Sequence, residues 1–529
     1  MDGHTAELLE LDTLGATLAF HAATRPERTA IICDGRRVTY GQLHRESDKG
    51  ARALCNAGLG QGERVAFFGR ESELYYEILF ACAKSGTVLV PVNWRLAPDE
   101  IEYILQDAET AVLFVEEEFL GVVERLRTVS ARLRTVVLLD GSAPSGITFE
   151  EWKSGGPGSL PLPTGLCTDD PIVQLYTSGT TGAPKGAVLA HRSFFAVRDS
   201  LARGGLDWVD WKPDDISLVA ISASHVGGLW WATQGFNAGV TNVTLGTFSS
   251  KEVLALIREL GVTTTCVVPQ MLRLLLADPE VSGGDFVTLR KVAYGGSPMS
   301  KELLLRCMEM MDCDFVQFYG LTETGNTVVC LPPSDHGPGA APPEAAGRAY
   351  PGFEVKITDP AGGVLPHGEK GEVRVRTPGL MVEYWRLPEA TASTVRDEWI
   401  RTGDAGHLDE TGYLFIEDRI KNMIIRAGEN IYPAEIEKAL DAHPSVAEAA
   451  VVGIPDERWG EAVYAFVSLH PLLEASPQEL RVFLRGRIAD FKIPTRFEFV
   501  DKIPRNPTGK ILHRTLRDQF WEARDKKVN

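Results

Sequence analysis

Helical segments alternate with short apolar strands along two long stretches of the chain, and this alternation is the feature that most limits the fold. The second stretch runs from Ile172 to about Leu331. Strands separated by helices form βα units and a mainly parallel sheet. We therefore predict an α/β fold. In the first stretch the apolar spacing predicts four elements in succession: a helix over residues 40–57, a strand over 64–68, a helix over 73–85 and a strand over 88–92.

The pattern changes in the last third of the chain. Residues 352–417 carry short alternating strands with glycine turns, which predicts a small β-barrel-like subdomain. The charged stretch Glu417-Asp-Arg-Ile-Lys421 follows, and residues 422–529 have an α+β pattern. We therefore predict a large N-terminal body over residues 1–417, with subdomains at about 1–165, 166–345 and 346–417, the first two of them βα-layered. A hinge at 418–421 then leads to a small, mobile α+β C-terminal domain at 422–529.

The charge balance argues against one class of function. The 529 residues include 54 Lys and Arg against 72 Asp and Glu, which gives a net charge of −18. A general nucleic-acid binder needs a basic face that neutralises phosphates, so we expect no nucleic-acid partner. A local basic pocket for a phosphate ligand is still compatible with this charge.

The cysteines and the apolar segments bear on the compartment. None of the eight cysteines stands in a C-x-x-C pair, and no histidine cluster accompanies them, which argues against a zinc site or a redox dithiol. Inert thiols of this kind are typical of a reducing cytoplasm. The first residues, Met-Asp-Gly-His-Thr-Ala-Glu, do not read as a signal peptide, and no run of 18 apolar residues predicts a transmembrane helix. We therefore expect a cytoplasmic protein.

A loop rich in glycine and hydroxyl side chains follows an apolar strand at residues 172–175. It reads Tyr176-Thr-Ser-Gly-Thr-Thr-Gly-Ala-Pro-Lys-Gly186. Glycines let backbone N–H groups approach an oxyanion closely, while the hydroxyls add donors and the lysine adds charge. The spacing differs from that of a Walker A loop. We predict a polyphosphate-binding loop, with a flexible Ser/Gly loop as the alternative. Its candidate ligands are Thr177, Ser178, Gly179, Thr180, Thr181, Gly182 and Lys185.

Six further motifs follow this loop along the chain. They are Gly295-Gly-Ser-Pro298, Tyr319-Gly-Leu-Thr-Glu-Thr324, Trp399-Ile-Arg-Thr-Gly-Asp404, Asp418-Arg-Ile-Lys421, Gly428-Glu-Asn-Ile-Tyr-Pro433 and Pro504-Arg-Asn-Pro-Thr-Gly-Lys510. With the loop at 176–186, they resemble in the same order the motifs of the adenylate-forming superfamily, which comprises acyl-CoA synthetases, adenylation domains and luciferases. The resemblance extends from about Leu14 to Arg517. It implies ATP, Mg²⁺ and CoA as cofactors and substrates.

The resemblance also implies two half-reactions in one site. The first makes acyl-AMP and releases pyrophosphate, and the second delivers a thiol nucleophile after the C-terminal domain has rotated. Lys421 stands at the position of the family's hinge residue, and Gly428 lies in the loop that resembles the lining of the pantetheine tunnel. Arg426 precedes this loop, where it would either meet a CoA phosphate or be solvated.

The chemistry of the first half-reaction selects the candidate catalytic residues. One anion, the carboxylate, must attack the α-phosphate of another, so the site must supply positive charge and alignment. Lys510, which follows Gly509 in a proline-rich loop, is the candidate that bridges the two anions, and a solvated surface lysine is the alternative. Thr322 and Glu323 suit contact with phosphate and with Mg²⁺ respectively, because Mg²⁺ prefers oxygen ligands.

A second set of residues is expected to bind the nucleoside. Tyr319 offers a ring for stacking on adenine, with core packing as the alternative, and the adjacent glycines let the backbone approach. Asp404 is a bidentate acceptor that suits the two ribose hydroxyls, and Arg419 matches a family arginine that also contacts the ribose. An exposed ion pair is the alternative for both. The nucleoside candidates are Gly295, Gly296, Ser297, Tyr319, Gly320, Asp404 and Arg419.

His225 matches the family's histidine at the mouth of the carboxylate pocket. Ala223 and Ser224 stand where the family often has a proline and an aromatic residue, and a core histidine is the alternative. No acidic side chain near His225 offers a partner for a substrate amine. The further pocket candidates suggest a mainly apolar slot for a fatty, alicyclic or aromatic acid. They are Gly228, Leu229, Gly325 and Asn326.

The main hypothesis is therefore an ATP-dependent carboxylic acid–CoA ligase. One alternative is a stand-alone adenylating enzyme that passes the acyl group to a carrier-protein thiol or an amine. Others are a luciferase-like oxidase and a non-catalytic nucleotide-binding protein, and the presence of Lys510, Glu323 and Asp404 argues against the last. We expect a small-molecule carboxylic acid, ATP and CoA as partners, and the choice between monomer and homodimer stays open.

Overall fold

A computed structural model gives the fold. It describes residues 7–126, 132–141, 146–155, 161–177, 184–297, 299–337, 340–342, 344–426, 429–456, 458–506 and 509–521. The chain divides into two compact units. The first comprises residues 1–354 and 375–400, and the second comprises residues 355–374 and 401–529.

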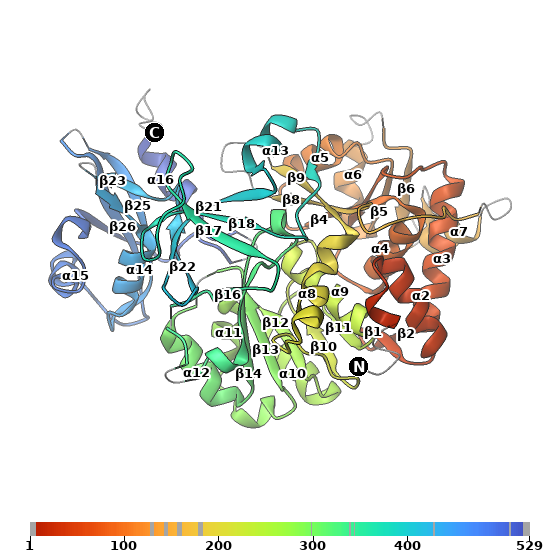
Figure 1. The fold of residues 1–529 in the computed structure, drawn as a ribbon, viewed down its shortest axis with the longest axis horizontal. Helices are drawn as coiled ribbons and strands as arrows, with labels where there is room; N and C mark the ends of the chain where they lie inside the picture. The colour runs from red at the N-terminus through yellow and green to blue at the C-terminus, as the bar shows by residue number, and fades with distance from the viewer. Residues whose placement is uncertain are drawn as a thin grey trace. The chain divides into compact units, whose positions relative to one another are not determined.

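An eight-stranded sheet in the first unit has the order β19-β9-β8-β4-β3-β5-β6-β7 (Figure 1). The strands from β8 to β7 pair in parallel, and β9 and β19 add antiparallel at one edge. The parallel run follows from the crossover helices that separate these strands. The strands are β3 (Arg64–Phe68), β4 (Val88–Val92), β5 (Val112–Val115), β6 (Thr135–Leu138), β7 (Ile147–Thr148), β8 (Pro171–Thr177), β9 (Lys185–Ala190) and β19 (Glu383–Tyr384).

Helices between these strands have clear signals at their ends. A capping box formed by Thr39 and Gln42 begins α3 (Tyr40–Asn56), and α4 (Glu73–Ser85) ends at Gly86, whose φ of +74° favours glycine. Side chains of α5 pack with the apolar residues of β3 to β6 in one core cluster. The remaining helices of this part are α2 (Leu14–Thr24), α5 (Pro98–Asp107), α6 (Leu120–Leu126) and α7 (Phe149–Ser154).

A nine-stranded sheet, also in the first unit, has the order β16-β15-β14-β13-β12-β10-β11-β1-β2. Its central strands, from β14 to β1, pair in parallel, and the strands beyond them at both edges are antiparallel. The strands are β1 (Thr29–Cys33), β2 (Arg36–Thr39), β10 (Ile216–Val219), β11 (Thr241–Thr244), β12 (Thr264–Val267), β13 (Lys291–Gly295), β14 (Asp314–Tyr319), β15 (Val329–Leu331) and β16 (Arg348–Ala349).

Three helices share one apolar core with the nine-stranded sheet. They are α10 (Ser250–Leu260), α11 (Pro269–Leu276) and α12 (Lys301–Met311), and they lie beside β10 to β14 in Figure 1. Two more helices, α8 (Ala196–Gly204) and α9 (Val226–Ala238), belong to the same stretch of chain. Burying the apolar sides of helix and sheet in this way supplies the main stabilisation of such a layered fold.

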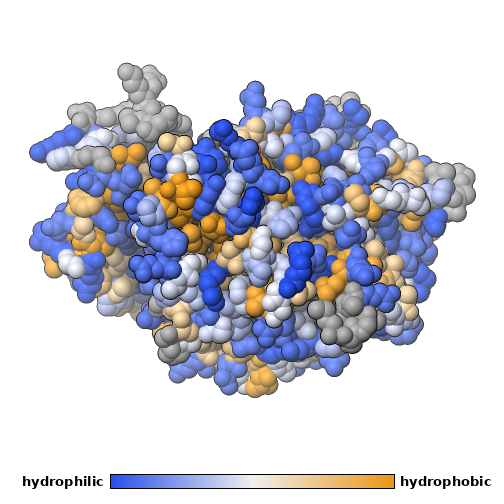
Figure 2. Space-filling view, in the orientation of Figure 1, coloured by the Kyte–Doolittle hydropathy of each residue, from blue (hydrophilic) through white to orange (hydrophobic). Residues whose placement is uncertain are grey.

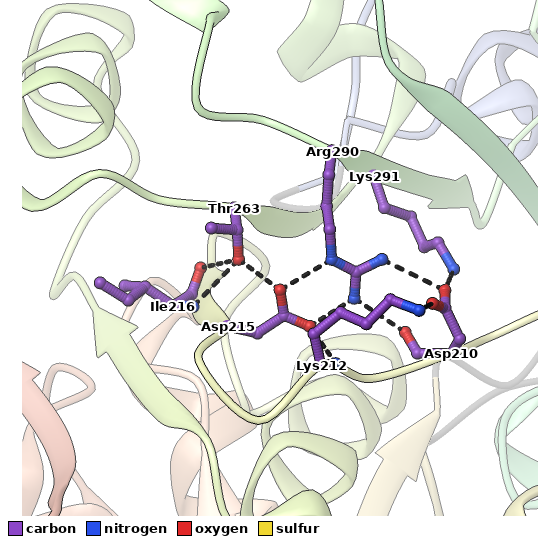
Figure 3. Close-up of polar contacts among 7 residues, drawn as sticks. All are labelled: Asp210, Lys212, Asp215, Ile216, Thr263, Arg290 and Lys291. Carbon is purple, nitrogen blue, oxygen red and sulfur yellow. Dashed lines mark hydrogen bonds and ion pairs between the residues drawn. The ribbon is translucent and has the colours of Figure 1, made fainter.

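A charged cluster joins the amino ends of β10, β12 and β13 (Figure 3). The Arg290 guanidinium donates to Asp215 Oδ1 at 2.7 Å and to Asp210 Oδ1 at 3.2 Å, and Lys291 also contacts Asp210. Thr263 Oγ1 donates to Asp215 Oδ1 at 2.7 Å. Burial raises the pKa of Asp215, but the hydrogen bonds from Arg290, the Lys212 N–H and Thr263 outweigh it and lower the pKa. The cluster thus holds three strand ends together at the sheet edge opposite the strands' carboxyl ends.

Five strands form a third sheet, most of whose residues belong to the second unit. Its order is β17-β18-β21-β20, with β22 paired to β21. This sheet corresponds to the small β-rich subdomain predicted at 346–417. The strands are β17 (Glu354–Thr358), β18 (Gly371–Arg376), β20 (Val395–Arg396), β21 (Trp399–Leu408) and β22 (Leu414–Arg419), with α13 (Pro388–Thr394) between β19 and β20.

The C-terminal part of the second unit is α+β. Its sheet has the order β24-β23-β26-β25, with β27 paired to β26. Two apolar clusters form its core, one with α14 and α15 and one with α16. The elements are β23 (Ile424–Arg426), β24 (Glu429–Ile431), α14 (Pro433–Asp441), β25 (Val446–Asp456), β26 (Gly460–Leu469), α15 (Pro477–Leu484), β27 (Arg496–Phe499) and α16 (His513–Trp521).

The predicted fold class, an α/β body with a smaller α+β C-terminal domain, is confirmed. Each sheet combines strands from both sides of the predicted boundary at residue 165: β1 and β2 join the nine-stranded sheet, and β8 and β9 join the eight-stranded one. The exact limits of the subdomains and of the C-terminal domain stay predictions. At the predicted hinge, β22 continues through the charged residues to Arg419, so only Ile420 and Lys421 lie beyond the strand.

The surface is mixed in character. Figure 2 shows hydrophilic residues over most of the face that it presents, with hydrophobic residues in smaller groups. Exposed large hydrophobic side chains occur on several separate elements, among them Leu274, Val287, Leu305 and Val482. In the part of the chain that the structure describes, no helix is long and apolar enough to cross a membrane.

Candidate active site

The carboxyl edge of the nine-stranded sheet brings the adenine-binding candidates together. Gly295 ends β13 and pairs with Phe318, next to Tyr319 at the end of β14. A Cβ on Gly295 would lie 2.5 Å from the Phe318 carbonyl oxygen, and Gly296 has a φ of +78°, so both positions require glycine. Ser297 follows and is exposed. Ligands of open α/β sheets bind outside the carboxyl ends of the strands, and this geometry fits that rule.

The turn after β14 holds Thr322 and Glu323. A Cβ on Gly320 would lie 1.8 Å from the Asn326 carbonyl oxygen, so the chain closes tightly on itself there. Inside this turn Thr322–Thr324 forms a short 3₁₀ helix, and Thr324 Oγ1 accepts a hydrogen bond from the Leu321 N–H at 2.8 Å. Gly325 and Asn326 follow with φ values of +74° and +103°. Thr322 and Glu323 are both half-buried, which leaves part of each side chain accessible to a ligand.

Tyr384 on β19 links two of the candidates and was missed by the sequence analysis. Its hydroxyl donates to Glu323 Oε1 at 2.6 Å, and Lys185 Nζ lies 5.0 Å from the centre of its ring. Tyr384 pairs with Ala187 across the sheet, which places it beside the start of β9 and Lys185. Tyr384 and Lys185 are about 200 residues apart in the sequence, so no local sequence pattern predicts that they are neighbours. The structure therefore joins the lysine of the predicted phosphate loop to the predicted Mg²⁺ ligand.

Removing the Tyr384 hydroxyl tests this link. In Tyr384→Phe we expect Glu323 to lose one hydrogen bond to its carboxylate, so that adenylation slows by about tenfold and needs more Mg²⁺. The measurement is ATP–pyrophosphate exchange over a range of Mg²⁺ concentrations. Tyr464→Phe is a matched control, because Tyr464 also donates to a glutamate, Glu498, at 2.6 Å in a different part of the chain. Equal effects of both substitutions would contradict a role for Tyr384 in the site.

His225 caps the amino end of α9 beside Asn93. Its Nε2 lies 3.4 Å from Asn93 Nδ2. Burial, and to a smaller extent the charge of Arg95, lower the pKa of His225 to about 4, so the ring is neutral at neutral pH. A neutral imidazole can form a hydrogen bond with a substrate carboxylate but cannot act as its counter-ion.

Two other predicted pocket residues have packing roles in α9. A Cβ on Gly228 would lie 2.1 Å from the Ile221 carbonyl oxygen, and Leu229 is 0% exposed. The close approach of the helix to the end of β10 is sufficient to explain a glycine at position 228. A direct contact of either residue with an acyl group stays a prediction.

In the second unit, Asp404 and Arg419 are cross-strand partners on β21 and β22. Arg419 Nε lies 2.8 Å from Asp404 Oδ1, and Arg419 Nη1 donates to the Thr402 carbonyl oxygen at 3.1 Å. Thr402 Oγ1 accepts from the Asp404 N–H at 3.1 Å and donates to the Val373 carbonyl oxygen at 2.7 Å. Asp404 is only 4% exposed. The pair is therefore a partly buried, anchored one, and the alternative of an exposed ion pair is wrong for it.

Lys510 lies in a short closed loop of the second unit. Asn506 Oδ1 accepts from the Lys510 N–H at 2.8 Å, the Asn506 N–H donates to the Lys510 carbonyl oxygen at 2.9 Å, and Gly509 has a φ of +80°. Lys510 is exposed overall, yet surrounding protein atoms desolvate its ammonium group. This desolvation and the charge of Arg419 lower the pKa of Lys510, against the opposite effect of Asp404 and Asp418. The structure thus places Lys510 in the electrostatic field of the Asp404–Arg419 pair.

The predicted hinge and thiol-channel residues are only partly described. Lys421 is exposed, and its carbonyl oxygen accepts from Arg517 Nη1 at 3.2 Å. Arg426 donates to the Phe491 carbonyl oxygen and lies 5.9 Å from the ring centre of Trp459, so its guanidinium is anchored within its own unit. The rest of the predicted phosphate loop and channel lies outside the described residues: Ser178, Gly179, Thr180, Thr181, Gly182 and Gly428.

Comparison with known proteins agrees with this geometry. The model of the family described as AMP-binding enzyme matches residues 18–385, and that of the AMP-binding enzyme C-terminal domain matches residues 435–510. The chain belongs to the AMP-binding enzyme family. As a member of it, the protein uses ATP, and the predicted enzyme class, an AMP-forming acid–thiol ligase, is confirmed.

Three relatives illustrate the similarity of this AMP-binding enzyme to known proteins. A fatty acid–[acyl-carrier-protein] ligase, ScoC of Streptomyces coeruleorubidus, is 56% identical over 98% of this chain and 99% of its own. An indoleacetate–CoA ligase of Aromatoleum aromaticum is 36% identical over 94% and 96%. The crystal structure of ATP-bound MatB from Rhodopseudomonas palustris, at 29% identity, covers 97% of this chain and 99% of its own with a TM-score of 0.87.

The site residues of this AMP-binding enzyme fit ATP with Mg²⁺. The glycines at 295 and 320 let the backbone pack closely against the Phe318 and Asn326 carbonyl oxygens, which holds the strand end and the turn of the nucleoside candidates together. Glu323 offers one carboxylate with hard oxygen donors. The described residues contain no cluster of three or more His, Cys, Asp and Glu that could hold a metal by themselves. This donor set suits Mg²⁺, which is commonly held by one or two carboxylates together with substrate phosphates.

Proposed function

We propose that this enzyme activates a fatty acid with ATP and transfers the acyl group to a phosphopantetheine thiol. One observation carries the adenylation step: Lys510 lies in the field of the anchored Asp404–Arg419 pair. A ribose held by that pair would bring the α-phosphate within reach of a long, charged side chain. The Lys185–Tyr384–Glu323 group of the first unit supports the same step, since it combines a cation with a carboxylate.

Each of these residues has a distinct part in the proposed reaction. Lys510 offsets the negative charge that builds up as the carboxylate attacks the α-phosphate, and the Asp404 carboxylate accepts hydrogen bonds from the ribose hydroxyls. Lys185 binds the outgoing phosphates as a point charge. Bound Mg²⁺ would be held by Glu323 and would neutralise phosphate charge there. Neutral His225 donates or accepts a hydrogen bond at the acid without adding charge.

The fatty acid is proposed from the apolar setting of the predicted acyl slot and from the relatives. Leu229, Trp230 and Trp231 on α9 are fully buried. ScoC and, at 32% identity, MmaC are named for a fatty acid and an acyl-carrier protein, while relatives at 35–36% identity are named as CoA ligases or synthases of indoleacetate and other acids.

CoA and a holo acyl-carrier protein both present a phosphopantetheine thiol, so acyl transfer to either acceptor is the same reaction. The 56% identity to ScoC over nearly the full length of both chains favours the carrier protein, and the broader set of CoA ligases keeps CoA as the second candidate. The cytoplasmic location stays a prediction, and the choice between monomer and homodimer stays open.

A pyrophosphate-release screen tests this proposal. Fatty, aryl and alicyclic acids are supplied in turn with ATP and Mg²⁺, and each is then paired with CoA, a holo acyl-carrier protein or an amine. We expect pyrophosphate release with fatty acids and acyl transfer to a thiol, with the carrier protein the better acceptor. Release without any added acid, or transfer only to the amine, would contradict the proposal.

A further inference from the structure

The peptide of Ala223, two residues before His225, is held from both sides by the loop after β3 and the first turn of α4. The Ala223 N–H donates to Glu71 Oε2 at 2.7 Å, and the Ala223 carbonyl oxygen accepts from the Tyr75 hydroxyl at 2.9 Å. Tyr76 donates to the other oxygen of Glu71. One residue therefore has both of its backbone polar groups bonded to side chains about 150 residues away in sequence.

Glu71 is an unusual residue for this position. It is only 6% exposed, and burial raises its pKa to about 7 against the opposing effect of its hydrogen bonds. The neighbouring Arg70 forms its ion pairs with Glu116 and Glu118. Within the described ranges, no ion pair of Glu71 is found. A buried carboxyl without a counter-charge is destabilising unless hydrogen bonds compensate it, so the fold retains Glu71 at a cost.

The held peptide lies inside the turn that leads to His225. The His225 N–H donates to the Ser222 carbonyl oxygen at 3.0 Å, which makes Ala223 a central residue of a tight turn. His225 is also the residue that caps α9. Because the turn is short, a shift of the Ala223 peptide would move the His225 ring relative to Asn93, its partner on the opposite side.

We propose that Glu71 and Tyr75 are positioning residues that fix His225 for binding of the acid. They act through the Ala223 peptide and touch no reacting atom. The proposal rests on the proposed function only for the identity of the ligand at His225. Inside the turn, Ser222 Oγ accepts from the Ser224 N–H at 3.3 Å and lies 3.0 Å from Ser224 Oγ, while the Ala223 side chain forms no hydrogen bond; Glu71 and Tyr75 add the restraint from outside the turn.

Three substitutions separate positioning from general support of the core. Glu71→Leu removes the acceptor of the Ala223 N–H, and Tyr75→Phe removes the donor to its carbonyl. Glu71→Gln keeps one acceptor oxygen for the N–H and serves as the conservative variant. Tyr76→Phe is the matched control, because it removes a hydroxyl from the same buried cluster without touching the turn.

We expect Glu71→Leu and Tyr75→Phe to raise the KM for the acid by about tenfold and to leave the KM for ATP within about twofold, since only the acid subsite is disturbed. Glu71→Gln and Tyr76→Phe should resemble the unaltered protein. The measurement is acid-dependent ATP–pyrophosphate exchange, with thermal melting to show that each variant is folded. If Glu71→Leu does not fold, the KM values of Tyr75→Phe still test the proposal. Parallel rises in both KM values, or an unchanged KM for the acid, would overturn the proposal.

A measurement on His225 itself distinguishes failure of this inference from failure of the proposed function. In protein with isotopically labelled histidine, the His225 ring resonance, assigned with His225→Gln, should shift in Tyr75→Phe and stay in place in Tyr76→Phe. This readout needs no substrate, so it tests positioning even if no acid is activated. A ring resonance that moves equally in both variants would show that Glu71 and Tyr75 merely support the core.

Discussion

Lys510→Ala is expected to slow acyl-adenylate formation by at least about 10²-fold, because in the proposed reaction Lys510 supplies the charge that offsets the approach of the carboxylate to the α-phosphate. The substitution should leave the fold intact, since the Lys510 side chain is exposed and the loop is closed by backbone atoms and Asn506. ATP–pyrophosphate exchange with the best acid measures the step directly. Binding of ATP should change far less than the rate.

Two comparisons sharpen this test. Lys502→Ala removes an exposed lysine eight residues earlier and should leave exchange unchanged. Lys510→Arg keeps the charge but replaces a compact ammonium by a planar guanidinium, so it should restore only part of the activity. Normal exchange in Lys510→Ala would show that another cation bridges the carboxylate and the α-phosphate, and would remove Lys510 from the catalytic residues.

Local patterns predicted the parallel core well. β3 and β4 occupy the predicted residues, because both are buried on two faces and therefore appear in the sequence as continuous apolar runs beside glycine turns. The end of β22 was not predicted. Its last residues, Glu417 to Arg419, are charged, and the strand extends to Arg419 because Asp418 and Arg419 pair with Ala405 and Asp404 on β21. A cross-strand partner can thus override the charge of a segment.

In the candidate site, too, the sequence predicted residues that lie in local motifs but not contacts between distant parts of the chain. The order of the motifs was enough to select Lys510, Glu323, Asp404 and Arg419 as candidates. Tyr384 contacts Glu323 and Lys185 through a pairing of β19 with β9 that joins distant parts of the chain. Glu71 likewise reaches Ala223 across about 150 residues, and its burial contradicts what a lone glutamate in a loop suggests. Such contacts depend on the packing of elements, which no periodicity within one element reports.

Asp404→Ala should raise the KM for ATP by about 10- to 100-fold, the range expected when a hydrogen-bonding partner with charge is lost. Arg419 should stay in place in this variant, because its Nη1 still donates to the Thr402 carbonyl oxygen. The rate with saturating ATP should fall much less than in Lys510→Ala, because the role proposed for Asp404 is to hold the ribose and not to contact the reacting atoms.

A comparison of ATP with 2′-deoxy-ATP, in the unaltered enzyme and in Asp404→Ala, isolates the contact between Asp404 and the ribose hydroxyls. If Asp404 binds the ribose hydroxyls, the unaltered enzyme should prefer ATP to 2′-deoxy-ATP by about tenfold, and Asp404→Ala should nearly lose this preference, since the two deletions remove the same interaction. Glu410→Gln, an exposed carboxylate in the turn between β21 and β22, is the control and should keep the preference. Independent, additive losses from Asp404→Ala and the missing hydroxyl would mean that Asp404 serves only to hold Arg419, and the ribose would have to be bound by other residues.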